Sequence, residues 1–103
     1  MAGTDNIPLE VLACDLTVFA PGEGAEHARL LGLVRGATLA REELEDGWRF
    51  ILTPDGFAAA AGWAGYERRC CEFFDFRLEW PSQGAPTLTV TGPPCTKELL
   101  SAW

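Results

Sequence analysis

The chain has 103 residues, which is enough for one domain with a modest core, and 48% of them are apolar. Its net charge of −7 argues against nucleic-acid partners and anionic membranes, because both require a basic surface. The sequence has no apolar run long enough to span a bilayer and does not begin like a signal peptide, so we expect a cytoplasmic protein without a membrane partner.

In the N-terminal half, the pattern of apolar and polar residues predicts a strand, a helix and a hairpin. Alternation in the strand places Cys14 on its apolar face, and the helix carries the only histidine, His27, on the same side as its leucines. Asp46 and Gly47 form a strong turn signal for the hairpin. The expected segments are a loose terminus at 1–8, a strand at 9–19, a helix at 25–35, and hairpin strands at 38–44 and 48–52.

The C-terminal half begins with the longest predicted helix, whose start is marked by Thr53 as N-cap and Pro54 in the first turn. The expected segments are this helix at 57–74, hairpin strands at 76–80 and 87–91, and a closing helix at 95–103. Residues 1–103 are therefore predicted to form a single α+β domain. It would be a mainly antiparallel sheet packed by helices, in the order β-α-β-β-α-β-β-α.

The helix predicted at 57–74 has an inward face that contains a carboxylate and two thiols. Glu67 lies one helical turn before Cys70 and Cys71, the separation at which helical side chains meet. A carboxylate that faces a core is costly unless it is paired or bound. It could accept a thiol proton, share a metal with the thiols, or pair with an arginine above buried structural cysteines. The face consists of Ala60, Trp63, Ala64, Glu67, Cys70, Cys71 and Phe74.

The chain has four cysteines, and in a cytosolic protein these are more typical of reactive, metal-binding or buried thiols than of disulfides. A bond between Cys70 and Cys71 is disfavoured because adjacent helical side chains diverge by about 100°. The principal hypothesis is a soft-metal-binding protein for sensing, sequestration or resistance, with zinc, copper(I) or mercury as the ion. Its predicted ligands are Cys70, Cys71, Cys14 and Cys95, with Glu67 as proton acceptor or supporting group.

Three of the candidate residues also have an ordinary structural interpretation. Cys14 could be a small core residue on the apolar face of its strand. Cys95 is expected in the first turn of the closing helix beside Lys97, where the helix dipole and the cation favour a thiolate, but it could also be a small residue tolerated there. His27 is interpreted first as a surface or half-buried helix residue, and it would be a ligand only if it faced the thiols.

Two other functions stay open. A thiol redox enzyme would use one cysteine of the pair as nucleophile and Glu67 as base. A module without catalysis would bind a small ligand or a protein in an aromatic pocket that includes Trp63 and Phe74. Exposed aromatic residues on an edge strand would favour a homodimer.

Two motifs carry a resemblance to a known family. Residues 67–76 read E-R-R-C-C-E-F-F-D-F, and residues 91–98 read T-G-P-P-C-T-K-E. They resemble a widespread family of small bacterial proteins with the pattern E-R-x-C-C-P-F, a strand hairpin and T-G-P-x-G-T-K-E, and the likeness covers most of the chain. The chain departs from this pattern at Glu72, where Pro is usual, and at Cys95, where Gly is usual. The resemblance implies the fold above and a focus on the glutamate and paired cysteines, and it assigns no activity.

Overall fold

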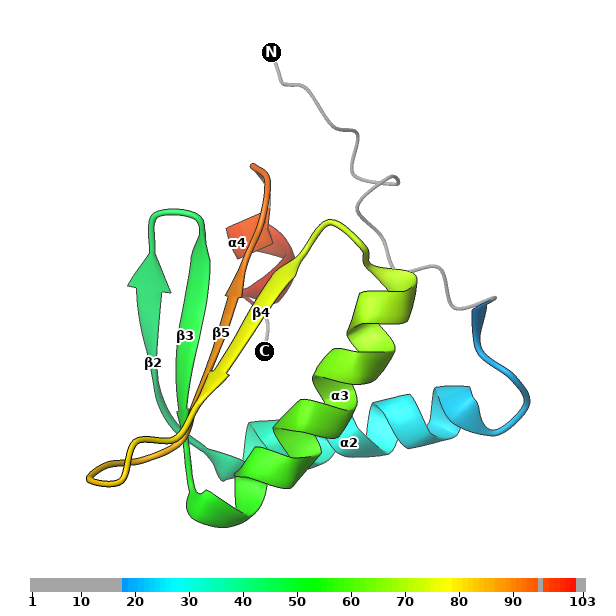
Figure 1. The fold of residues 1–103 in the computed structure, drawn as a ribbon. Coiled ribbons are helices and arrows are strands. Elements are labelled where there is room, and N and C mark those ends of the chain that lie inside the picture. The colour runs from blue at the N-terminus through cyan, green and yellow to red at the C-terminus, as the bar shows by residue number, and fades with distance from the viewer. Residues whose placement is uncertain (1–17, 95, 102–103) are drawn as a thin grey trace.

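A computed structural model describes residues 18–94 and 96–101 (Figure 1). The predicted loose terminus and nearly all of the predicted first strand lie outside these residues, and Val18 and Phe19, the two that are described, are not in a strand. The elements are α2 (Glu23–Ala37), β2 (Thr38–Leu44), β3 (Gly47–Leu52), the short 3-10 helix η2 (Pro54–Gly56), α3 (Phe57–Cys70), β4 (Asp75–Glu79), β5 (Thr87–Thr91) and α4 (Thr96–Leu100).

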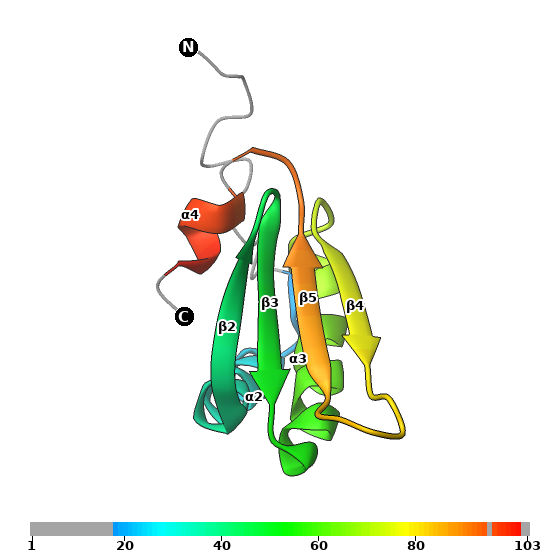
Figure 2. The same ribbon diagram turned by 90° about the vertical axis from the view of Figure 1, so that its left-hand side faces the viewer.

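The strands form one antiparallel sheet in the order β2-β3-β5-β4. Both predicted hairpins are confirmed, and the sheet joins them through the central pair β3 and β5, in which Phe50 lies opposite Leu88. Figure 2 shows α2 and α3 together behind the sheet. The predicted α+β class, a mainly antiparallel sheet packed by helices, is therefore confirmed.

The hydrophobic core lies between the sheet and the helices. Trp63 of α3 has no exposed surface, and neither have Leu52 of β3 and Leu88 and Val90 of β5. Alternation brings the apolar residues of each strand to the same side of the sheet. On α3, apolar residues that are three and four positions apart likewise lie on one face of the helix. None of the helices in the described part of the chain is long and apolar enough to cross a bilayer.

Helix α3 ends at Cys70, before the predicted end at Phe74. Cys71 has φ −131° and ψ 76°, so the backbone leaves the helix there, and its N–H donates to the Glu67 carbonyl at 2.6 Å. Arg68 donates to the Glu72 carbonyl at 2.5 Å. The chain must reverse within a few residues to begin β4, and this turn buries Phe74 in the core although it is no longer helical.

A glycine lies where α2 approaches α3. Leu30 and Val34 of α2 are buried in the core. A Cβ atom built on Gly62 of α3 would lie 3.1 Å from Leu30 Cδ1, so glycine allows the two helices to pack closely. One turn before Leu30, the same face of α2 carries His27, which therefore points at α3.

Candidate metal site

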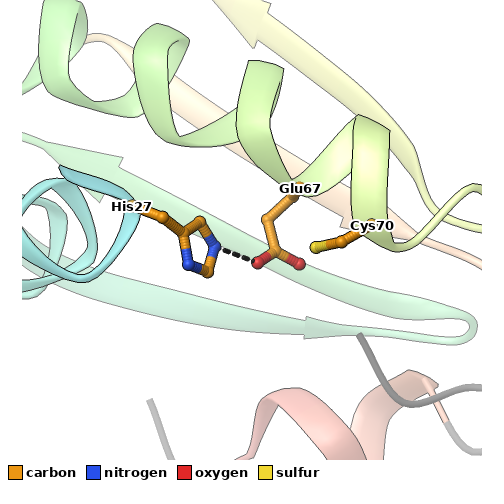
Figure 3. Close-up of side chains that lie close together, drawn as sticks. All are labelled: His27, Glu67 and Cys70. Carbon is orange, nitrogen blue, oxygen red and sulfur yellow. Dashed lines mark hydrogen bonds and ion pairs between the residues drawn. The ribbon is translucent and has the colours of Figure 1, made fainter. Parts of the chain in front are cut away.

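The centre of the site is the buried carboxylate of Glu67. Glu67 is only 4% exposed, as its place on the apolar face of α3 predicts. Its Oε2 lies 2.5 Å from Nε2 of His27, whose side chain is 13% exposed (Figure 3). The hydrogen bond joins residues 40 positions apart and crosses from α2 to α3.

Burial raises the pKa of the Glu67 carboxyl, because the charged form loses its hydration. The hydrogen bond to His27 acts in the opposite direction and is the smaller effect. Glu67 therefore holds a proton more tightly than an exposed glutamate, and at 2.5 Å a proton lies between its oxygen and the imidazole nitrogen.

Cys70 supplies the third donor atom. It is the last residue of α3, it is 6% exposed, and its sulfur lies beside the Glu67 carboxylate (Figure 3). One nitrogen of His27, one oxygen of Glu67 and the sulfur of Cys70 all lie within 4.8 Å of one another. Imidazole, carboxylate and thiolate are the three kinds of zinc ligand found in proteins, so this group could hold a metal ion.

Two aromatic rings lie beside the imidazole, and an arginine lies against these rings. The rings of Phe19 and Tyr66 lie 5.2 and 6.2 Å from that of His27, centre to centre. The guanidinium of Arg69 lies 5.3 Å from the Phe19 ring centre, and it donates to both carboxylate oxygens of Glu23 at 3.0 and 3.1 Å. The two rings give the imidazole an apolar surrounding, and such a surrounding strengthens electrostatic interactions.

The structure places Cys71 next to the site but in a different chemical state from the one expected. Its sulfur lies 3.7 Å from that of Cys70, which is too far for a bond between the two. Cys71 is nevertheless disulfide-bonded, which corrects the expectation that the cysteines are reduced. Cys14 and Cys95, the other two predicted ligands, lie outside the described residues.

The predicted pocket residues Trp63 and Phe74 lie in the hydrophobic core, where they are 0% and 4% exposed. Each packs edge-on against the ring of Phe76, with ring centres 5.8 and 6.1 Å apart. Edge-to-face packing of this kind stabilises cores.

His27 is the residue whose role the sequence did not establish. One alternative for Glu67 is an ion pair with an arginine, but the structure pairs Glu67 with His27. Arg68 donates to the Glu72 carbonyl, and Arg69 pairs with Glu23. The available signal was the position of the only histidine on the apolar face of its helix. Two polar side chains that each lie on an apolar helix face are candidates to form a hydrogen bond with one another.

No model of a known protein family matches the chain, and neither a curated protein nor a solved structure matches it. The resemblance to the family with the E-R-x-C-C-P-F pattern therefore stays an expectation.

Proposed function

We propose that the protein binds a divalent metal ion, with zinc as the first candidate, through His27, Glu67 and Cys70. The observation that carries this proposal is the convergence of three donor atoms of different kinds within 4.8 Å at a buried position. The mixed nitrogen, oxygen and sulfur set suits zinc better than copper(I), which prefers sulfur alone, and mercury and cadmium remain candidates through the thiolate. The biological role would be sensing, sequestration or resistance.

The distances indicate what an ion must displace. Two donors bound to one tetrahedral zinc at about 2.0–2.1 Å lie about 3.3 Å apart. Nε2 of His27 and Oε2 of Glu67 are 2.5 Å apart, so they cannot bind an ion until their hydrogen bond opens. The ion would take the place of the shared proton, and affinity would rise with pH. Three protein ligands would leave a fourth position open.

The position of Cys70 favours a cation over a reactive thiolate. Cys70 is the last residue of α3, and the C-terminal end of a helix carries partial negative charge. This charge stabilises a nearby cation and opposes an isolated thiolate. A redox role nevertheless keeps one supporting observation, namely that the Cys70 sulfur lies 3.7 Å from a disulfide-bonded sulfur.

The test is a zinc titration against a competing chelator, repeated with cadmium to follow the thiolate charge-transfer absorbance. We expect one ion per chain. His27→Gln, Glu67→Gln and Cys70→Ser should each weaken binding more than about tenfold, because even residues that only support a ligand contribute about 10–100-fold. Glu72→Gln, which changes an exposed carboxylate on the adjoining turn, is the matched control. Equal affinity in wild type and all three ligand variants would overturn the proposal.

A further inference from the structure

The site lies directly beside a sulfur that is already oxidised. Cys71 has no exposed surface, and it follows Cys70 at the point where the backbone leaves α3. Its sulfur lies 3.7 Å from that of Cys70 and is disulfide-bonded. In this form Cys71 has no thiolate to offer, so among the residues that the structure describes the group that could hold an ion is His27, Glu67 and Cys70.

We infer that the Cys71 disulfide is a redox control on the metal site, and that its reduction supplies Cys71 as the fourth ligand. The inference rests on the proposed function. In the oxidised protein the ion has three protein ligands, whereas in the reduced protein it has four and is held more tightly.

The separation of the two sulfurs supports this inference. In a tetrahedral zinc site with Zn–S bonds of about 2.3 Å, two sulfurs lie about 3.8 Å apart. The sulfurs of Cys70 and Cys71 are separated by 3.7 Å. Adjacent helical side chains would diverge by about 100°, but Cys71 is not helical, and its φ of −131° lets its side chain lie beside that of Cys70. The two sulfurs are therefore already separated by the distance that two sulfurs bound to one zinc ion would have.

The chemistry balances with an external dithiol as the reductant. The reductant gives two electrons and two protons, its own two thiols become a disulfide, and the Cys71 disulfide becomes two thiols. The Cys71 thiol then releases its proton to solvent as its sulfur binds the ion. A bound ion would in turn protect this thiolate from reoxidation, so the redox state and the metal load control each other.

The experiment measures cadmium and zinc binding to the whole chain as oxidised and after treatment with a dithiol that is then removed. Cadmium–thiolate absorbance should be higher in the reduced protein than in the oxidised protein by the contribution of Cys71, with zinc affinity at least about tenfold higher on reduction. Reduced Cys71→Ser should behave as oxidised wild type does. This variant keeps Cys14 and Cys95, so its difference from reduced wild type reports on Cys71 alone.

Equal affinity and equal absorbance of the two wild-type forms would overturn the inference, and this comparison needs no variant to fold. Because Cys71 is fully buried, Cys71→Ala provides a second substitution if Cys71→Ser fails to fold. Binding by both forms with no difference would leave the proposed function standing and remove only the redox control. Absence of binding by either form would overturn the proposed function itself.

Discussion

A buried glutamate bonded to a half-buried histidine has a cost that the rest of the fold must offset. The apolar face of α3 would pack more simply with leucine at position 67, because burying a carboxyl is unfavourable even when it is hydrogen-bonded. The hydrogen bond between Nε2 of His27 and Oε2 of Glu67, at 2.5 Å, satisfies one oxygen of this carboxyl. Residues that destabilise a fold in this way are often retained for what they bind.

The stability of the metal-free protein should depend on pH through Glu67. Its pKa is raised by burial, so the folded protein holds this proton more tightly than the unfolded chain does. As pH rises from the ordinary value of about 4.3 through the raised value, the free energy of unfolding should therefore fall. Glu67→Gln removes this titration. Urea unfolding with a chelator present should show the variant gaining stability relative to wild type as pH rises.

The control for this prediction is Glu72→Gln, whose stability should follow wild type at every pH because the carboxyl at position 72 is exposed. His27 and Cys70, which face the same carboxyl, remain in both proteins. Curves for Glu67→Gln and wild type that stay parallel from about pH 4 to about pH 8 would contradict the assignment of a raised pKa to Glu67.

Helix α3 carries two of the three donors. Two glycines, one just before this helix and one within it, have very different surroundings. Gly56, in η2 just before the helix, is buried, and a Cβ atom there would lie 2.4 Å from the Cβ of Ala37 at the end of α2. Gly65, in the middle of α3, is exposed, and a Cβ atom there would meet nothing within 4 Å. The first glycine is needed for packing, whereas the second only weakens the helix.

Alanine substitutions at these two positions should therefore act in opposite directions. Gly65→Ala should raise the free energy of unfolding by about 0.5–1 kcal/mol, because alanine is the better helix former. Gly56→Ala should lower it by about 1–3 kcal/mol, because a methyl group must be forced between η2 and α2. Urea denaturation of the two variants beside wild type measures both effects. A loss of stability in Gly65→Ala would show that the surface of α3 is not open there.

In the whole molecule, the site lies where two helices on the same face of the sheet meet. His27 comes from α2, while Glu67 and Cys70 come from α3, and both helices bury their apolar residues in the shared core. An ion bound across this junction requires the docked arrangement, so binding and global folding are linked.

Zinc should therefore stabilise the folded chain. At a concentration 100 times the wild-type Kd, the free energy of unfolding should rise by about 2.7 kcal/mol in wild type and by less than about 1.4 kcal/mol in His27→Gln, whose Kd should be more than about tenfold higher. Leu88→Ala is a control for general destabilisation. It should lose about 2–5 kcal/mol because Leu88 is fully buried, yet it should gain the same increment from zinc because it keeps all three donors. Thermal or urea unfolding with and without zinc gives these values. An equal gain in His27→Gln would place the ion elsewhere.

Local patterns in the sequence predicted both hairpins and the inward face of α3, because alternation, the Asp46-Gly47 turn and helical spacing act over a few residues. The pairing of β3 with β5 and the bond between His27 and Glu67 were not predictable, since they join distant segments. The end of α3 was missed because the residues up to Phe74 continue the helical spacing, although the chain must turn before β4. The disulfide of Cys71 was missed because the chain was expected to be cytosolic, and thiols in the cytosol are usually reduced.

His27 and Glu67 are 40 residues apart in the sequence, and this separation affects the order in which the parts of the chain fold. Each hairpin joins neighbouring strands and can form early, whereas the donor atoms meet only once α2 has docked on α3. We expect this contact to form after the transition state for folding, so that a bound ion hardly changes the rate of folding and mainly slows unfolding. The metal would thus set how long each molecule stays folded, while the chain alone sets how quickly it folds.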